Sequence, residues 1–332
     1  MSVLSGGAGQ PIPQMAWNHI PAASLDRLRC PGSRELQLLR QVVGECLGRD
    51  GGDAPSDLTP AGAPLEVAFV WPSGELRVSA DPCPGAGARA RLLSCLSGLT
   101  AALSPHQARH VERVAAWQRE HGSRFGGWLG YRVIGGILRS KLYLDVPRGA
   151  PWQAWEAEVC DAAPVLPSRS LRLAMIGLDT RSGGLELYYR CDRLFPKELD
   201  TLLKRLRLPE RGGEVVALVA ALTRRSIRFE LPSYDMGFSY AFDGQGRPQV
   251  FTWYSVAEAL LGPPGKVREA ILRVGRAAGW DLDAYARLTD ARAVPGHGLV
   301  GAVLAPELPM QVTATVAASR PQGEAGDAGP VG

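Results

Sequence analysis

Five pairs of short runs with strand-like alternation recur along the chain. They lie near residues 66–81, 128–146, 171–190, 237–255 and 298–318, and sequence with mostly helical spacing separates them. In the second run of each pair, apolar residues alternate with polar or aromatic ones. Because successive side chains of a strand point to opposite faces, this alternation predicts a sheet with one apolar and one polar surface.

Helices between the pairs can cover the apolar surface, and the polar surfaces must then face one another. Closing the sheet makes the polar surface line a lumen. We therefore predict an α+β fold, a ten-stranded antiparallel barrel of five helix–hairpin units with helices outside. The polar surface of the second runs carries Arg77, Ser79, Lys141, Tyr143, Asp145, Glu186, Tyr188, Arg190, Gln249, Phe251, Trp253, Gln311, Thr313 and Thr315. Such a lumen is costly to build unless it holds a ligand, and its cations favour an anionic one.

The same pattern predicts the domain organisation. We expect a flexible N-terminal segment over residues 1–22, a single barrel domain over 23–318 and a disordered tail over 319–332. Helical spacing predicts a short helix that opens at Pro151 and longer helices over 33–48, 87–103, 105–121, 195–207, 213–225, 256–262 and 265–279.

Composition excludes several classes of protein. The net charge of +4 is far below that of a general nucleic-acid binder. The six cysteines include no CxxC motif, which argues against a zinc site and against a disulfide scaffold. A signal-peptide pattern and an apolar run of 18 residues are both absent, so we expect a cytoplasmic protein that does not bind membranes. The excess of Arg, Ala, Gly and Pro indicates a GC-rich bacterial genome.

A carboxylate and an arginine flank the first predicted hairpin. Glu66 begins the first run, and Arg77 follows eleven residues later in the paired run. This spacing can bring a proton acceptor and an anion-binding cation to one face of the sheet. Alternatively, Glu66 is a solvated residue at the start of a strand and Arg77 is an ordinary surface residue.

A lysine and a tyrosine share one face of the second pair. Lys141 is one of only four lysines in the chain, and Tyr143 points the same way two residues later. An ammonium beside a phenol hydroxyl is typical of a phosphate-binding pair. The alternative is a lysine that protects an edge strand from aggregation.

The third and fourth pairs repeat this arrangement of charged and aromatic residues. Glu186, Tyr188 and Arg190 alternate along one run, and Gln249, Phe251 and Trp253 alternate along the other. Aromatic faces stabilise a carbocation and exclude water from it. Alternatively, each of these aromatic side chains, taken alone, simply fills space inside the barrel.

No metal site is predicted. The sequence contains no HExxH and no DDxxD, and it lacks the glycine-rich nucleotide-binding motifs GxxxxGK[ST] and GxGxxG. His106 and His110 share a helix face, but no third ligand accompanies them.

Local stretches spread over residues 60–320 resemble the aromatic prenyltransferases with the ABBA barrel, and within them the dimethylallyltryptophan synthase (indole prenyltransferase) branch. The stretches are LEVAFVWPSGELRVSADP, SKLYLDV, IGLDTRSGGLELYYR and RPQVFTWYS. The resemblance implies transfer of a prenyl group from a prenyl diphosphate to an aromatic acceptor of the indole or tryptophan type, in secondary metabolism. It also implies that no cofactor is required and that magnesium is not essential.

The resemblance further implies roles for individual residues. Glu66 would take the acceptor's proton. The diphosphate would be bound by Arg77, Lys141, Tyr143, Tyr188, Arg190, Gln249 and Gln311, and the prenyl and acceptor pocket would include Glu186, Phe251 and Trp253. The chain departs from the family's pattern at Gly184 and Glu186, where the family has arginine and lysine, and in its last hairpin, which has no tyrosine.

Three other interpretations remain open at this level. The first is a peptide prenyltransferase of the cyanobactin type with the same barrel. The second is a non-catalytic barrel that binds a small molecule without turnover. The third is an open sheet with a solvated polar face. The sequence leaves the donor length, the acceptor, the attacked atom and the oligomeric state open.

Overall fold

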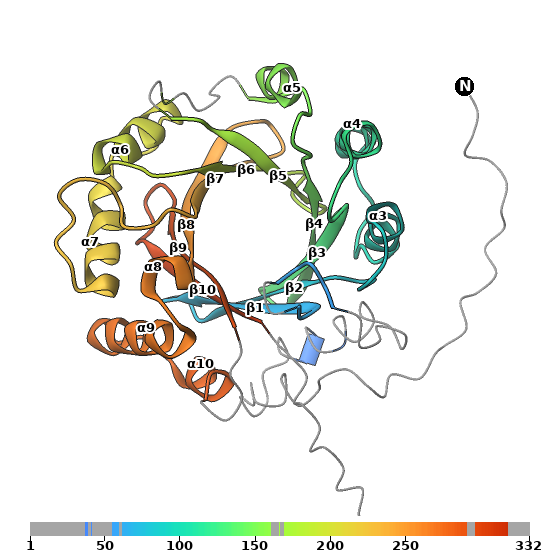
Figure 1. The fold of residues 1–332 in the computed structure, drawn as a ribbon. Helices are drawn as coiled ribbons and strands as arrows, with labels where there is room; N and C mark the ends of the chain where they lie inside the picture. The colour runs from blue at the N-terminus through green and yellow to red at the C-terminus, as the bar shows by residue number, and fades with distance from the viewer. Residues whose placement is uncertain are drawn as a thin grey trace, which may run out of the picture.

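Ten antiparallel strands close into a barrel in the computed structural model (Figure 1), in the spatial order β1-β10-β9-β8-β7-β6-β5-β4-β3-β2. The structure describes residues 37–38, 41, 55–59, 62–160, 166, 169–290 and 296–317. The strands are β1 (Leu65–Trp71), β2 (Glu75–Ala80), β3 (Gly127–Ile134), β4 (Ile137–Asp145), β5 (Arg172–Asp179), β6 (Leu185–Cys191), β7 (Met236–Phe242), β8 (Pro248–Val256), β9 (His297–Leu304) and β10 (Gln311–Ala317).

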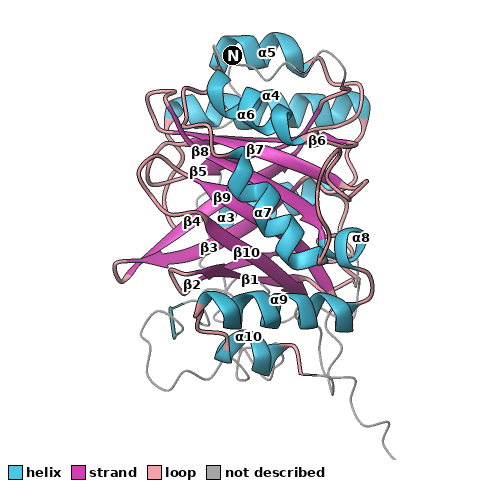
Figure 2. Ribbon diagram, turned by 90° about the vertical axis from the view of Figure 1, so that its left-hand side faces the viewer, coloured by secondary structure: helices cyan, strands magenta, loops and turns pink. Residues whose placement is uncertain are grey.

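Helices cover the outside of this barrel (Figures 1 and 2). The described helices are α3 (Ala88–Ser97), α4 (Pro105–His121), α5 (Trp152–Val159), α6 (Pro196–Arg205), α7 (Gly212–Thr223), α8 (Ala257–Leu261), α9 (Pro264–Ala278) and α10 (Asp283–Leu288). Among the residues that the structure describes, no helix combines the length and apolar character that crossing a bilayer requires.

The predicted fold is confirmed by this closed barrel, and the open-sheet alternative is wrong. Each of the five predicted hairpins is present, and seven of the predicted helices correspond to α3–α9. The short helix α10 was not predicted. The predicted helix over 33–48 falls almost entirely outside the described residues, and the segments 1–22 and 319–332 lie wholly outside them, so these expectations stay predictions.

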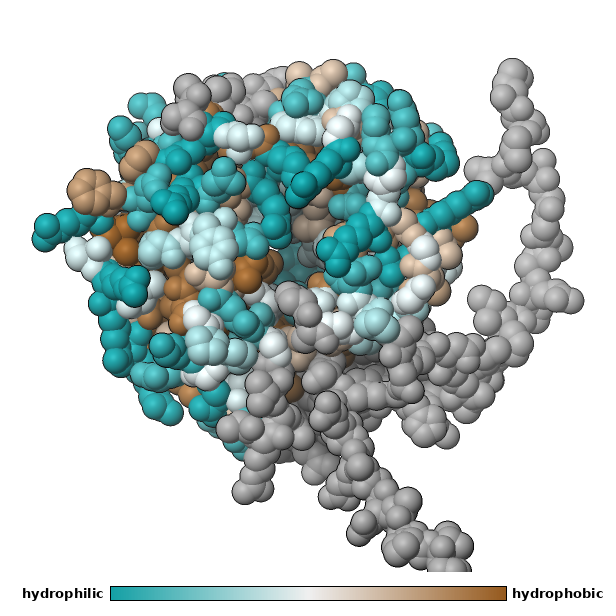
Figure 3. Space-filling model, viewed as in Figure 1, coloured by the Kyte–Doolittle hydropathy of each residue, from teal (hydrophilic) through white to brown (hydrophobic). Residues whose placement is uncertain are grey.

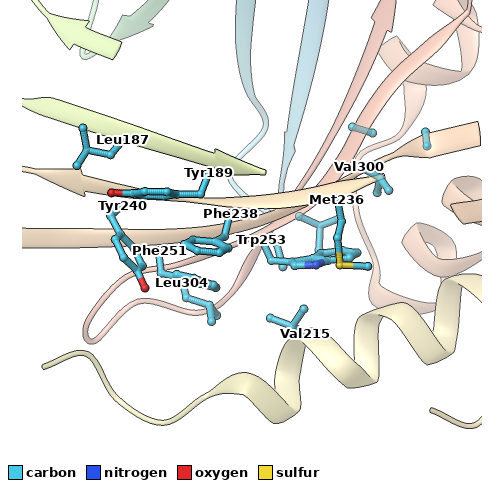
Figure 4. Close-up of a cluster of buried hydrophobic side chains, with 14 of the residues drawn as sticks. Leu187, Tyr189, Val215, Met236, Phe238, Tyr240, Phe251, Trp253, Val300 and Leu304 are labelled. Atoms are coloured by element: carbon cyan, nitrogen blue, oxygen red, sulfur yellow. The ribbon is translucent and has the colours of Figure 1, made fainter. Parts of the chain in front are cut away.

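The hydrophobic core lies between the outer face of the barrel and the helices. Outward-facing residues of neighbouring strands stack there, for example Tyr189 on Phe238 with ring centroids 5.1 Å apart. Figure 4 shows this cluster beside helix α7, which contributes Val215. Phe251 and Trp253 belong to the same cluster and are fully buried. Aromatic residues on the outer face of the sheet therefore form part of the core and hold the helices against the sheet.

This position corrects the predicted direction of Phe251 and Trp253, which were expected to face the lumen. The register between β7 and β8 shifts, since Ala241 pairs with Val250 whereas Phe242 pairs with Pro248. Gln249 is the extra residue of this β-bulge. One inserted residue inverts the inward and outward alternation that follows it, so the polar Gln249 predicted the wrong phase for the rest of β8.

A capping box begins helix α4. The Ser104 hydroxyl accepts a hydrogen bond from the Gln107 backbone N–H at 3.2 Å, and the Gln107 side chain accepts one from the Ser104 N–H at 3.1 Å. Gln107 also donates from Nε2 to the carbonyl of Asp179 at 2.8 Å, which ties the start of the helix to the end of β5.

We expect Ser104→Ala to lower the free energy of unfolding by about 1 kcal/mol, because the Gln107 backbone N–H at the helix start loses its side-chain acceptor. In a domain of this size the loss corresponds to about 2 °C in Tm, measured by calorimetry. Ser97→Ala, at an exposed serine near the end of α3, is the control. Equal Tm values for the two variants would contradict the role of the cap.

Candidate active site in the barrel lumen

A large cavity of about 1420 Å³ runs through the barrel. A hollow is visible on the barrel axis in the space-filling view of Figure 3. The lumen is lined by polar, charged and aromatic side chains from the strands, in contrast to the apolar outer face. It is large enough for two small-molecule substrates, since ordinary ligand pockets measure roughly 300–1,000 Å³.

Lumen-facing glycines let long side chains lie across neighbouring strands. A Cβ atom at Gly177 would lie against the Lys141 side chain, including its Nζ at 3.1 Å. A Cβ atom at Gly298 would likewise contact the Glu66 carboxylate and the Thr315 hydroxyl. Each glycine thus leaves the space that a functional side chain of an adjacent or nearby strand occupies.

Glu66 is held near the end of the lumen where β1 begins. Its Oε1 accepts a hydrogen bond from the Thr315 hydroxyl at 2.7 Å, and that hydroxyl accepts one from the Leu299 N–H at 2.6 Å. Burial raises the pKa of the Glu66 carboxyl to about 7, although the hydrogen bond from Thr315 acts in the opposite direction. A carboxyl with this pKa is suited to general-base chemistry near neutral pH.

Lys141 lies at the centre of a polar network in the lumen. Its Nζ forms an ion pair with Glu186 and donates a hydrogen bond to the Tyr188 hydroxyl at 3.1 Å. Glu186 also accepts a hydrogen bond from Ser239. Burial alone would raise the pKa of the Glu186 carboxyl, but the Lys141 ammonium and these hydrogen bonds hold that pKa below its usual value. Glu186 is therefore a negative charge within this network.

An aromatic belt surrounds this network, formed by Trp128, Tyr143, Tyr188 and Tyr254. Trp128 stacks on Tyr143 at 5.8 Å, and the rings of Tyr143 and Tyr188 are 5.9 Å apart. Tyr254 follows at 6.4 Å from Tyr188. The Lys141 ammonium lies 5.1 Å from the centroid of the Tyr143 ring. Such ring faces stabilise a cation and exclude water.

The remaining predicted residues occupy the two ends of the lumen. Arg77 is the third residue of β2, near the β1–β2 hairpin turn, and it is paired with Glu75 at 3.0 Å. Gln311 begins β10 and lines the same end, and Gln249 is exposed at the β7–β8 turn. Arg190 lies near the end of β6 that is remote from the hairpin turn, and it pairs there with Asp235 at 2.8 Å.

The structure thus brings some of the predicted site residues together and separates others. Lys141, Tyr143, Glu186 and Tyr188 form one cluster. Arg190 lies at a different end from Arg77, and Phe251 and Trp253 are outside the lumen altogether. The sequence interpretation missed Trp128, Tyr254, Arg132 and Arg139, which also line the cavity. Arg139 precedes Lys141 by two residues, so the alternation of that strand could have found it.

The site's polar chemistry comes from amino-acid side chains that are already close together. In the part of the chain that the structure describes, no group of three His, Cys, Asp or Glu residues is arranged to hold a metal ion. A base with a pKa near 7, the cations that line the lumen and the belt of aromatic rings can together bind an anionic leaving group, shield a cation and accept a proton.

Comparisons with known proteins agree with this architecture. The chain matches no family model and no curated protein. It is similar to a solved structure of PriB in complex with product diphosphate, with a TM-score of 0.68, 17% identity and coverage of 89% of this chain and 93% of that chain. A 6-dimethylallyltryptophan synthase from Micromonospora olivasterospora in complex with DMASPP and Trp gives a TM-score of 0.66, 17% identity and coverage of 89% and 95%.

A third similar structure is a 5-dimethylallyltryptophan synthase from Streptomyces coelicolor in complex with DMASPP and Trp. It gives a TM-score of 0.65 at 17% identity, over 90% of this chain and 95% of that chain. At these identities the likeness establishes the fold, which is the ABBA barrel, and confirms that part of the sequence interpretation.

Proposed function

We propose that the protein transfers an allylic prenyl group from a prenyl diphosphate to an aromatic acceptor of the indole or tryptophan type, without a metal ion. The observation that carries this proposal is the position of Glu66 in the same lumen as the Lys141 network and the aromatic belt. The solved structures named above support it, since three of them hold product diphosphate or DMASPP with Trp. Its place in secondary metabolism and in the cytoplasm stays a prediction.

In the proposed reaction the bond between the allylic carbon and a diphosphate oxygen breaks, and the electron pair leaves with the diphosphate. Cations and phenol hydroxyls of the lumen stabilise that departing charge because they are already oriented toward it. The belt of Trp128, Tyr143, Tyr188 and Tyr254 shields the allylic cation. The aromatic ring forms the new bond to the allylic carbon, and its proton passes to Glu66.

The direct test is turnover of the purified protein with dimethylallyl or geranyl diphosphate. The acceptors are tryptophan, indole-containing peptides and simple phenols, and mass spectrometry detects the added prenyl mass. We expect product in the presence of EDTA. Product that disappears with EDTA and returns with magnesium would refute the metal-independent chemistry. No product from any pair, together with no binding of pyrophosphate by calorimetry, would refute the proposed function.

The raised pKa of Glu66 predicts the pH profile of this reaction. Only the carboxylate accepts a proton, so kcat/KM should rise with pH and level off above about 7. Thr315→Val removes a hydrogen bond that lowers the pKa of Glu66, and the midpoint should then move to higher pH. A pH profile caused by ionisation of the substrate would not change in Thr315→Val. If the midpoint of kcat/KM against pH stays where it is, the profile belongs to a group other than Glu66.

A further inference from the structure

Three arginines of the lumen stand side by side on three adjacent strands. Arg77 of β2 pairs in register with Arg132 of β3, and Arg132 pairs with Arg139 of β4. All three line the cavity. Residues directly opposite one another in antiparallel strands have Cβ atoms roughly 4.5–5.5 Å apart, and like charges at such positions destabilise a sheet. This row of Arg77, Arg132 and Arg139, which we call the arginine row, therefore needs compensating negative charge.

The protein itself supplies only part of that compensation. Glu75 accepts two hydrogen bonds from Arg77, at 3.1 and 3.0 Å. Asp179 accepts one from Arg132 at 3.1 Å. Among the described residues no carboxylate pairs with Arg139, and its buried Nε has no hydrogen-bond partner. A buried guanidinium nitrogen without a partner is costly, and an acceptor from outside the protein would satisfy it.

At the hairpin end, the wall of the described lumen that β6 forms carries no arginine. The lumen positions where β6 begins are Gly184, directly before the strand, and Glu186, of which the first has no side chain and the second is an anion. Glu186 is occupied by the Lys141 ammonium and by Ser239. At the hairpin end of the described lumen, the cations that can receive an anion thus lie on β2, β3 and β4, with Lys141 two residues beyond Arg139 on the same face. Arg172 of β5 and Arg190 of β6, which pair in register, line the other end of the cavity.

We propose that the arginine row binds the diphosphate of the prenyl donor, with Arg132 and Arg139 as donor-binding residues in addition to Arg77. This inference rests on the proposed function. Guanidinium groups bind phosphate oxygens through two parallel hydrogen bonds, and three such groups in one row match the several oxygens of a diphosphate.

The row also fixes the direction in which the donor lies. Each arginine is the third residue from the hairpin end of its strand, whereas Glu66 is in the second position of β1, at the other end of the strands. The diphosphate then occupies the hairpin end of the lumen, and the prenyl chain extends toward the aromatic belt and Glu66. The acceptor must therefore approach from the end at which the strands connect to the helices.

Calorimetry of the full chain with inorganic pyrophosphate in EDTA tests this assignment. Charge-assisted hydrogen bonds contribute about 1.5–3 kcal/mol each, so Arg132→Gln and Arg139→Gln should each weaken pyrophosphate binding by about 10- to 100-fold. Arg148→Gln removes the same charge from a different part of the lumen lining and should change the affinity by less than about threefold. Arg139→Lys keeps the charge without the fork and should bind with intermediate affinity.

Two results would overturn the inference. The first is wild-type pyrophosphate affinity in both glutamine variants. The second is a loss confined to Arg190→Gln, which would place the diphosphate at the other end of the lumen. Prenyl transfer by the wild-type protein is measured alongside. If the wild type is active and either result is found, the proposed function stands and only the assignment of the donor site to the arginine row fails. Thermal melting verifies that each variant is folded. If a glutamine variant does not fold, the pyrophosphate affinity of Arg139→Lys is the test instead.

Discussion

Glu66→Gln should lower kcat for prenyl transfer by about 10²–10⁴-fold, the range that a positioned general base contributes. The amide keeps the size of the side chain and can still accept the hydrogen bond from the Thr315 hydroxyl, so the lumen should retain its shape. It cannot take the acceptor's proton. Pyrophosphate affinity, measured by calorimetry, should stay within about twofold of the wild type because the arginine row and Lys141 are unchanged.

Asp145→Asn is the matched control for this prediction. Asp145 also lines the lumen, its pKa is raised by burial, and it accepts a hydrogen bond from Ser123 at 2.8 Å. Its replacement should leave kcat within about threefold. A loss in Asp145→Asn as large as that in Glu66→Gln would mean that the lumen responds to any change in its charge. Binding of small molecules that is indifferent to Glu66→Gln, without product from the wild type, would instead favour the non-catalytic barrel.

The barrel could be predicted because alternation with period two is a local property of each strand. In β2, β4, β6 and β10 the polar and apolar positions of the sequence are the lumen and helix-covered positions of the structure. The prediction failed in β8, where the bulge at Gln249 reverses the alternation. A bulge depends on pairing with β7, which the sequence of β8 alone does not contain. Tyr254 was consequently missed, and Phe251 and Trp253 were placed on the wrong face.

The electrostatics of the site could not be predicted from the sequence, because they depend on contacts between distant strands. The Lys141–Glu186 pair joins side chains 45 residues apart and requires Gly177, which leaves the space across which Lys141 lies. Likewise, the pKa of Glu66 depends on burial by a closed lumen. The sequence did indicate which residue types share a surface. Which of them neutralise one another is decided only by the register and by the reach of each side chain.

Lys141→Met should lower kcat/KM by about 10²–10³-fold, a loss typical of one preorganised donor to a developing negative charge. Two causes act together here. The diphosphate loses a nearby cation, and Glu186 loses the partner that neutralises it. A carboxylate left unpaired in the lumen repels the donor, so pyrophosphate binding should weaken as well.

The pair of variants Lys141→Met and Glu186→Gln separates these two causes. Glu186→Gln alone should tighten pyrophosphate binding, because the Lys141 ammonium is then free to bind the anion. In the double variant the unpaired carboxylate is gone, so about tenfold of the kcat/KM lost in Lys141→Met should return. Residues in one network are expected to show such coupling, whereas independent sites give additive effects. The two single variants and the double variant form a double-mutant cycle. If their effects on kcat/KM are additive, Glu186 does not compete with the donor for Lys141, and the ion pair persists when the diphosphate is bound.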